Sequence, residues 1–475
     1  MKKINDNGTK RPGKNDSSKG RQRVEIRFKN QELRNLRERM LADKSKEYYA
    51  CLLGKRQDIG DLCVITVKDV RFPEAENYKR QAGAALRVSG EFLRNTLLEI
   101  EERIDVDTLI DVHTHPFSEG NVWFSYTDSE DERNFLQYMR EEKLAIGLAS
   151  IVLSQTDYQA RLWEANAHGK IVSRPARVKT QKWSEQIPSS DPQFQERRAI
   201  EPDGQFNRSV LALGLDTMRT ITGNQVITVA GVGGVGSIIA EHLVHMGFAH
   251  IHLIDFDTLE LSNLNRIVAA THEDAIKQRV KVEAIRENLL KINPNAEIIA
   301  HNSDVFTEEA ERVMAESDWI LVATDNHASR HHIQEIAFRY YVPFITAGVN
   351  ITVENGQIQD MSGEVILIRM GDRVCLTCLK RLRYNDIAAE IHPDANVREG
   401  LVRKGYVQGM NVKEPAVKTL NTHIATMAVD VLVNQYTERQ RDAVIRVYED
   451  NVAPLVYEDT ESVTCRDLQC HVCSG

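Results

Sequence analysis

Residues 226–236 have the sequence VITVAGVGGVG, and this stretch decides the fold of the second half of the chain. Five residues typical of a buried strand are followed by a glycine-rich turn, and a helix is expected from about Ser237. In such an arrangement backbone N–H groups at a helix N-terminus bind phosphate. Asp255 ends the next expected strand, about where an acid binds ribose. The stretch therefore predicts a nucleotide site whose turn contains Gly231, Gly233, Gly234 and Gly236.

The segments that follow continue the same alternation of strand and helix. A helix is expected around 277–291, and the expected strands lie at 251–255, 297–301, 319–324 and 343–348. Alternation of this kind implies parallel pairing and a doubly wound, Rossmann-like sheet. The glycines alone also allow a dinucleotide-dependent oxidoreductase.

Polar residues after the turn favour ATP over a dinucleotide. A site for hydride transfer needs no cluster of amides, cations and a second acid around the phosphates. A site that forms an acyl adenylate needs cations for the triphosphate and for the leaving pyrophosphate, and a carboxylate for magnesium. The residues that provide these groups are Asp257, Asn263, Arg266, Lys281, Asp325 and Asn326.

With these motifs, residues 205–475 closely resemble the ubiquitin-activating, ThiF/MoeB-type adenylyltransferase family. The resemblance implies that Asp255 binds ribose, that Asp325 holds Mg²⁺, and that the phosphates contact Asn263, Arg266 and Lys281. Asp257 and Asn326 are expected beside the bound ATP. The segment Phe206-Asn207-Arg208 is similar to the end of the family's Arg-Tyr-x-Arg segment, although its first part is degenerate here. Arg208 is therefore expected to reach the ATP of a second subunit, which implies a homodimer.

Four of the seven cysteines form two Cys-x-x-Cys pairs, which is the unit of a closed structural zinc site. The pairs are Cys375 with Cys378 and Cys470 with Cys473. The resembling family often has this zinc. Activating enzymes that form a thioester carry a cysteine after the first pair, and residues 379–420 contain none. Cys465 is either the nucleophile or an ordinary free thiol, and Cys51 and Cys63 are expected to be buried.

A second motif lies in the first half of the chain. His113 and His115 follow an expected strand at 108–112, so both side chains leave the same face of that strand. Asp128 supplies a third ligand soon after, and three ligands leave zinc a fourth position for water. Glu47, just before another expected strand, is a candidate proton acceptor.

This constellation resembles the JAB/JAMM (MPN+) metalloprotease family over residues 24–165. The resemblance implies a catalytic zinc on His113, His115 and Asp128, with Glu47 as general base and Ser125 polarising the scissile carbonyl. The interval between the second histidine and the serine is two residues longer than usual, so Asp131 is an alternative ligand.

The composition of the whole chain restricts its class, its partners and its location. The chain has 475 residues, 42% hydrophobic and 27% charged, with a net charge of -9, which is typical of globular proteins and makes a nucleic-acid partner unexpected. No apolar run is long enough for a membrane span, and the cysteines are few and odd in number, which indicates a reducing compartment and a cytoplasmic protein. We expect a disordered basic tail at 1–22, an α+β JAB/MPN-like domain at 23–165, a proline-bearing linker at 166–205 and the α/β adenylyltransferase domain at 206–475.

Both resemblances concern the glycine-terminated tail of a ubiquitin-like protein. The sequence therefore predicts a bifunctional enzyme of a prokaryotic ubiquitin-like pathway. It would adenylate the carrier's terminal carboxylate, hydrolyse an amide just beyond that terminus, and have a conjugating enzyme as a further partner. The alternatives are a sulfur-carrier adenylyltransferase with a processing peptidase for cofactor or cysteine biosynthesis, and a carrier-binding scaffold whose metal site is inactive.

Overall fold

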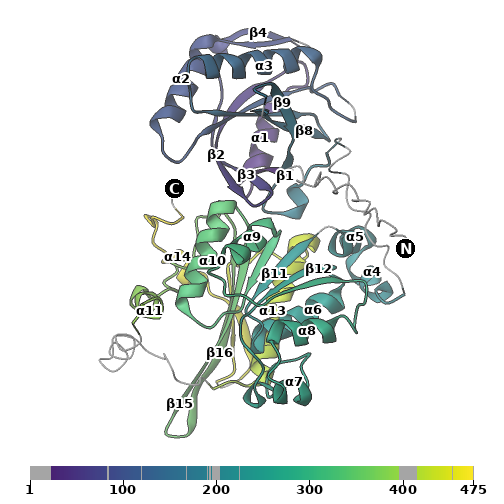
Figure 1. The fold of residues 1–475 in the computed structure, drawn as a ribbon, viewed down its shortest axis with the longest axis vertical. Coiled ribbons are helices and arrows are strands. Elements are labelled where there is room, and N and C mark those ends of the chain that lie inside the picture. Colours follow the sequence, from purple (N-terminus) through teal and green to yellow (C-terminus); the bar gives the residue numbers. More distant parts are fainter. Residues whose placement is uncertain are drawn as a thin grey trace, which may run out of the picture.

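The computed structural model shows two lobes, each built on an eight-stranded sheet (Figure 1). Its described residues are 23–475 without 83–84, 119, 167, 190, 192–193, 195–203, 224, 395–414, 452 and 474–475. The expected tail at 1–22 lies outside the described residues.

The N-terminal lobe is a curled mixed sheet. Its strand order is β10-β1-β3-β2-β6-β7-β8-β9. The strands are β1 (Arg23–Arg27), β2 (Tyr49–Ile59), β3 (Leu62–Arg71), β6 (Thr108–Thr114), β7 (Gly147–Leu153), β8 (Tyr158–Ala165), β9 (Ile171–Pro175) and β10 (Arg177–Lys179). Only Ala176 separates β9 from β10, although the two strands lie at opposite edges. The sheet must therefore curl until its edges approach each other.

Helices cover this sheet on two sides. One apolar cluster includes residues of α1 (Glu32–Met40), and another includes residues of α2 (Gly90–Glu102) and α3 (Tyr126–Glu141). A small hairpin of β4 (Tyr78–Ala82) and β5 (Ala85–Val88) follows the 3-10 turn η1 (Ala75–Asn77). Alternate residues of β2 are divided between the two clusters, Ala50 and Leu52 in the first and Cys51 and Leu53 in the second, because successive side chains point to opposite faces.

The expected linker at 166–205 is wrong over its first part, because β9 and β10 belong to the sheet. Prolines suggested a linker there, but Pro175 ends an edge strand, where a missing N–H breaks no ladder on the open side. The 3-10 turn η2 (Trp183–Glu185) then lies against the second lobe. Most of 190–203 lies outside the described residues.

The C-terminal lobe has the expected doubly wound sheet, in the order β13-β12-β11-β14-β15-β16-β17-β18. The strands from β13 to β15 are parallel, and β16 to β18 are added antiparallel. The strands of this sheet are β11 (Val226–Ala230), β12 (His250–Ile254), β13 (Glu297–His301), β14 (Trp319–Val322), β15 (Phe344–Glu354), β16 (Gln357–Ile368), β17 (Ile445–Glu449) and β18 (Leu455–Glu458).

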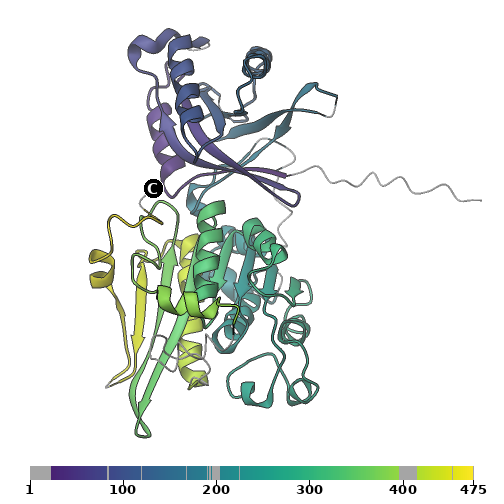
Figure 2. The ribbon, with the colours of Figure 1, turned by 60° about the vertical axis from the view of Figure 1, so that its left-hand side comes forward.

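Helices pack on both faces of this second sheet. One face is covered by α6 (Gly234–Met246), α8 (Lys281–Leu289) and α13 (Lys418–Thr437), and the other by α9 (Glu308–Glu316) and α10 (His327–Tyr340). Figure 2 shows the β15–β16 hairpin extending away from the N-terminal lobe. The remaining helices are α4 (Asn207–Leu213), α5 (Leu215–Gly223), η4 (Leu261–Asn263), α7 (His272–Ile276), α11 (Tyr384–Glu390) and α14 (Thr460–Thr464).

The two lobes share a buried joint. Leu62 and Val64 of β3 belong to the same apolar cluster as α9 and α10 of the second lobe. Arg27 is only 2% exposed, and it donates to the backbone oxygens of Tyr340 and Ala315, each at 2.7 Å. Its remaining charge is balanced by Glu25, whose carboxylate lies 2.6 Å away. A buried arginine with all of these partners fixes one lobe against the other.

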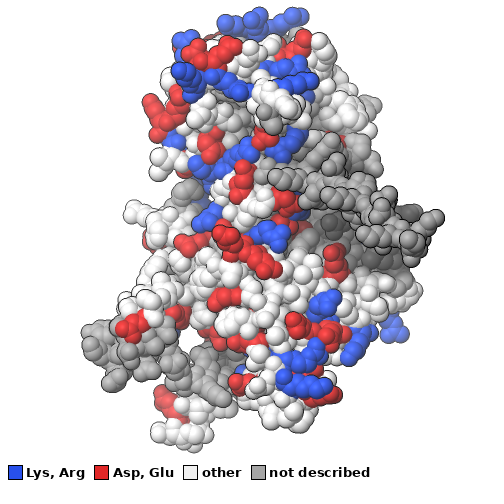
Figure 3. Space-filling view, viewed as in Figure 1, with Lys and Arg blue, Asp and Glu red and all other residues white. Residues whose placement is uncertain are grey.

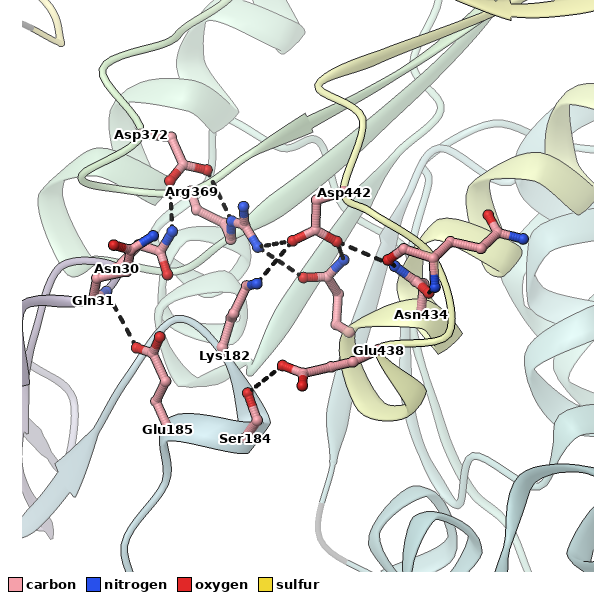
Figure 4. A network of polar contacts seen from close by, with 12 residues as sticks. Asn30, Gln31, Lys182, Ser184, Glu185, Arg369, Asp372, Asn434, Glu438 and Asp442 are labelled. Carbon is pink, nitrogen blue, oxygen red and sulfur yellow. Dashed lines mark hydrogen bonds and ion pairs between the residues drawn. The ribbon is translucent and has the colours of Figure 1, made fainter. Parts of the chain in front are cut away.

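A second set of polar contacts ties the segment after β10 to the end of α13 (Figure 4). Lys182 forms an ion pair with Asp442 at 2.9 Å, and Asp442 also accepts from Arg369 at 2.7 Å. Asn30 donates to Asp372, and Ser184 donates to Glu438, both at 2.6 Å. These residues come from both lobes, so the network extends the joint.

The described surface carries charges of both signs, as the modest net charge of the chain suggests. Basic and acidic side chains are interspersed on the face in Figure 3, where grey atoms are not described. Within the described ranges, no helix is both long and apolar enough to cross a membrane.

Candidate functional sites

The glycine-rich turn lies between β11 and α6, and its geometry requires glycine. Gly231 has φ +84°, and a Cβ atom there would lie 3.0 Å from the oxygen of Ala323. A Cβ on Gly236 would lie 1.8 Å from the oxygen of Gly231. Gly233 precedes α6, where no side chain caps the helix and the first turn has no acid. The helix start is therefore suited to an anion.

Two acids and a lysine lie beside this turn. Asp255 follows β12, and its carboxylate accepts from the N–H groups of Val232 and Asp257, both at 2.9 Å. Lys281 begins α8, is 8% exposed, and has its Nζ 2.6 Å from Asp257 Oδ2 and 3.9 Å from Asp255 Oδ1. Burial raises the pKa of Asp255, and the Lys281 charge opposes that effect. Three predicted residues thus meet at the carboxyl ends of the strands.

Arg266 lies over the start of α6. Its Cδ would be 3.1 Å from a Cβ atom on Gly234, and its guanidinium donates to the Ser262 oxygen at 2.8 Å. Asn263, at the end of η4, accepts from the N–H of Glu260 at 3.1 Å. The Arg266 side chain is therefore positioned at the turn.

Asp325 lies close in sequence to residues that adjoin Gly231. It is exposed and follows Ala323 and Thr324, whose backbone atoms adjoin Gly231. Asn326 caps α10 by accepting from the N–H of Ser329 at 2.7 Å. The asparagine therefore has a structural task, while the carboxylate of Asp325 is open to solvent.

The structure does not bring Arg208 to the turn of its own chain. Arg208 is exposed on α4, and the preceding Phe206 packs against Gly247, at the C-terminal end of α6. Because α6 has 13 residues, that end lies about 20 Å from the glycine turn. Any contact of Arg208 with a nucleotide would need a second subunit.

The second candidate site is a cluster of metal-ligating side chains in the N-terminal lobe. His113, His115 and Asp128 place one ligand atom each within 4.8 Å of one another. The Nε2 atoms of the two histidines lie 3.6 and 3.9 Å from Asp128 Oδ2. Nε2 of His113 is buried and has no hydrogen-bond partner among the described residues, so this donor set fits a metal ion. Asp131 is not in the cluster.

The local fold explains how Asp128 reaches the histidines. Ser125 caps α3: its Oγ accepts from the N–H of Asp128 at 3.1 Å, and the Asp128 carboxylate accepts from the N–H of Ser125 at 2.6 Å. This capping box fixes the acid at the helix start. The Ser125 hydroxyl accepts in this contact, so its own proton is left to donate.

Glu47 lies next to the cluster. The Thr114 N–H donates to the oxygen of Tyr48 at 3.1 Å, which aligns Glu47 with His115 across the β2–β6 pair. Burial raises the pKa of Glu47, and the charges of His113 and Asp128 both act on it. The backbone of Glu47 is held by the β4 residues Gln81 and Ala82.

Sequence reasoning missed a further acid behind the cluster. Asp111 Oδ1 lies 3.7 Å from Nδ1 of His113, and Tyr49 donates to Asp111 Oδ2 at 2.6 Å. Burial alone would lower the pKa of His113, but Asp111 and Asp128 raise it to about 10. Two carboxylates therefore act on the His113 ring, one from each side of the cluster. The spacing of two residues along β6 was the available signal, because it puts Asp111 and His113 on one face.

The four paired cysteines meet at the end of the C-terminal lobe. Their sulfur atoms lie within 4.8 Å of one another, with Cys375–Cys470 at 3.5 Å and Cys378–Cys473 at 3.8 Å. Sulfurs bound tetrahedrally at about 2.3 Å from zinc are about 3.8 Å apart, so the set fits zinc with no open position. Burial raises the pKa of Cys375 to about 12. Cys465 is exposed and outside the set, and the prediction that Cys51 and Cys63 are buried is confirmed.

Two other residues near the nucleotide turn were not predicted. Asn421 of α13 is 2% exposed and adjoins Gly234. Glu390 of α11 accepts from the N–H groups of His327 and Ala328 at the start of α10, at 3.3 and 2.6 Å. Both lie far along the chain from the turn, so no local pattern points to them.

Known proteins resemble part of the chain. Molybdopterin-synthase adenylyltransferase of Escherichia coli (strain K12) is 32% identical over 180 residues, which are 37% of this chain and 68% of that protein. Ubiquitin-like modifier-activating enzyme 5 of Xenopus laevis is 28% identical over 237 residues, 47% of this chain and 54% of that protein. SUMO-activating enzyme subunit 2 of Dictyostelium discoideum is 29% identical over 174 residues, 36% of this chain and 24% of that protein.

A solved structure and a family model also match part of the chain. The crystal structure of E. coli MccB with AMPCPP and MccA has a TM-score of 0.45 and 18% identity, and covers 57% of this chain and 74% of that one. The model of the ThiF family matches residues 206–456, more than half of the chain. The chain therefore belongs to the ThiF family.

Proposed function

We propose that the C-terminal lobe is an ATP-dependent adenylyltransferase that joins AMP to the terminal glycine carboxylate of a ubiquitin-like or sulfur-carrier protein. The observation that carries this proposal is the cluster of Asp255, Lys281 and Arg266 around the glycine turn of a ThiF-family chain. Relatives named for molybdopterin-synthase adenylylation and for activation of ubiquitin-like modifiers support the substrate class.

The proposed reaction is attack of a carboxylate oxygen on the α-phosphorus of ATP. The new bond is oxygen to α-phosphorus, and the bond to the β-phosphate oxygen breaks, so pyrophosphate leaves. Lys281 and Arg266 would neutralise charge that develops on the phosphates, Asn263 and Asp257 would line the site, and Asp255 would hold the ribose. Asp325 would hold Mg²⁺, and Arg208 of a second subunit would complete the site in a homodimer.

Exchange of radioactive pyrophosphate into ATP, in the presence of a glycine-terminated carrier, tests this function. Replacement of Arg266 or Asp325 by Ala should lower exchange about 10²- to 10³-fold, because each removes charge stabilisation in a preorganised site. Lys277→Ala is the matched control, since that lysine is exposed and pairs with Glu273 on α7. Absence of carrier-dependent exchange in the wild type would overturn the proposal and favour a dinucleotide enzyme.

We propose a second function, metal-dependent hydrolysis of the amide just beyond the carrier's terminus, for the N-terminal lobe. Its support is the unpartnered Nε2 of His113, which shares a cluster with His115 and Asp128. These three side chains would hold the ion. When bound, zinc supplies a Lewis acid and lowers the pKa of a water molecule.

The chain's own residues would act around that ion. Glu47 would take a proton from the attacking water and give it to the leaving amine. The Ser125 hydroxyl would donate to the scissile carbonyl oxygen, because its oxygen is already held by the Asp128 N–H. Asp111 would hold His113 in one orientation.

Cleavage of a carrier with a short C-terminal extension tests this second function. Replacement of Asp128 by Ala should remove one of two bound zinc ions and abolish cleavage, while pyrophosphate exchange persists. Asp131→Ala is the control, because Asp131 lies on the same helix outside the cluster. Binding of the extended carrier without cleavage by the wild type would favour the scaffold alternative.

A further inference from the structure

The amide of Asn421 is buried without a hydrogen-bond partner for its oxygen. Asn421 is 2% exposed, and Oδ1 accepts no hydrogen bond from any described residue. Its neighbours on the same face of α13, including Leu420, Ile424 and Ala425, are apolar and buried. An unsatisfied buried amide costs about 1–3 kcal/mol. A leucine or alanine would pack in this interface without that cost, so the amide is expected to have a partner in the working protein.

The side chain of Asn421 is aimed at the glycine turn. Its Nδ2 would lie 2.3 Å from a Cβ atom on Gly234, and Arg266 would lie 3.1 Å from the same atom. Asn265, next to Arg266, donates to the oxygen of Ala416, just before α13. The unpartnered amide and the Arg266 side chain therefore meet at one point, the first residue of α6.

Two helices also begin at this point. Asn421 in the first turns of α13 adjoins the start of α6, while Tyr436 near the end of α13 packs on Phe248, just beyond the end of α6, with ring centroids 6.1 Å apart. The helices are therefore parallel. Neither has a side-chain cap or an acidic residue in its first turn. Their positive dipole ends and their free N–H groups thus face the same space as the Asn421 amide and Arg266.

We infer that α13 is a second phosphate-binding helix, and that Asn421 contacts the polyphosphate of the bound nucleotide. The inference rests on the proposed adenylyltransferase function and adds a residue and a helix to it. Nδ2 would donate to a phosphate oxygen between the two helix starts, while Oδ1 would accept from a group of the nucleotide or its hydration shell. Asn421 lies about 190 residues from the turn in sequence, so the contact depends on the packing of α13 against α6.

Calorimetric titration with MgATP tests the inference on the full chain. Asn421→Ala should bind MgATP about tenfold or more weakly, as expected for one lost hydrogen bond to a charged group. Asn421→Asp has the same shape but a negative charge, so it should bind more weakly than the Ala variant. Thr426→Ala is the control, because Thr426 is exposed on the same helix beyond its first turn and should leave binding unchanged.

A second measurement separates ligand binding from packing. Without nucleotide, Asn421→Leu should melt at a higher temperature than the wild type, because it replaces an unsatisfied amide by an apolar side chain. With saturating MgATP the wild type should gain more thermal stability than this variant.

The binding results distinguish a failure of the Asn421 inference from a failure of the proposed function. If the wild type binds MgATP and the Ala and Asp variants bind it equally well, the inference is wrong while the proposed function stands. Tighter binding by Asn421→Asp would also overturn it, because the position would then be holding a cation. If the wild type itself neither binds MgATP nor exchanges pyrophosphate, the proposed function fails.

Discussion

The two clusters of metal-ligating side chains differ in how many ligands they offer and in what surrounds them. In the N-terminal lobe, two histidines and Asp128 leave a tetrahedral ion one free position, beside Glu47 and the exposed Ser125. In the C-terminal lobe, four cysteine sulfurs fill every position, and three of the four cysteines are buried. An open site suits chemistry and a closed site suits structure.

The surroundings show the same difference. The histidine cluster rests on a strand and a helix start that would be in place without an ion, because the β2–β6 pair and the Ser125 capping box hold them. The cysteine cluster joins the loop after β16 to the last residues described, about 95 residues apart. Loss of the ion should therefore affect activity at the first cluster and folding at the second.

The largest effect is expected at the cysteine cluster. Replacement of both Cys470 and Cys473 by Ser should remove one zinc per chain and lower the free energy of unfolding by at least about 3 kcal/mol, because a structural ion contributes directly to folding. Zinc content and urea unfolding measure this. The matched control is Cys465→Ser, at an exposed thiol outside the cluster. Unchanged zinc content would contradict the comparison.

The next effect concerns the open cluster. Replacement of Glu47 by Gln should lower cleavage of a tail-extended carrier about 10²- to 10⁴-fold, because the proton acceptor is lost. Zinc content and thermal stability should stay near those of the wild type, since Glu47 is not in the ligand set. A parallel fall in pyrophosphate exchange would show that the two lobes do not act separately.

Acid should weaken the joint that holds the two lobes together. Burial alone would raise the pKa of Glu25, but Lys179 and Arg27 lower it to about 2. Because the pKa of Glu25 is lower in the folded protein, its ionised carboxylate stabilises the fold at pH values above about 4.3, the pKa in the unfolded chain. This stabilisation of about 3 kcal/mol is lost as the pH falls toward 2.

Denaturant unfolding between pH 6 and pH 2.5 measures this dependence. Glu25→Gln should be less stable near neutral pH, because Arg27 loses its buried partner, and its stability should change less with pH. Glu76→Gln, at an exposed position, should match the wild type. An equal acid dependence in all three proteins would show that the Glu25 pair does not stabilise the joint.

The smallest effect is expected behind the open cluster. Asp111→Asn should weaken zinc binding about 10- to 100-fold, as for other carboxylates that orient a histidine ligand. Competition with a chelator measures this. Tyr49→Phe removes only the hydrogen bond to Asp111 and should have a weaker effect of the same sign. Equal zinc affinity in Asp111→Asn and the wild type would leave Asp111 without a role in orientation.

Several features of the sites could be predicted because their residues are close in sequence. The glycine turn, the Cys-x-x-Cys pairs and the two histidines each lie within one turn, one loop or one strand end, where backbone geometry sets the side-chain positions. The linker prediction failed over β9 and β10, since proline tolerates an edge strand and pairing there depends on the curl of the whole sheet.

The sequence by itself indicated the residues of each candidate site: a glycine turn with Asp255 and Lys281 after it, a three-ligand cluster, and a set of four cysteines. Only the tertiary structure decided what surrounds them. Asn421 reaches the turn because α13 packs in parallel on α6, and Arg27 is buried because β1 lies against the ends of α9 and α10. Such contacts follow from the packing of distant elements, which no local periodicity records.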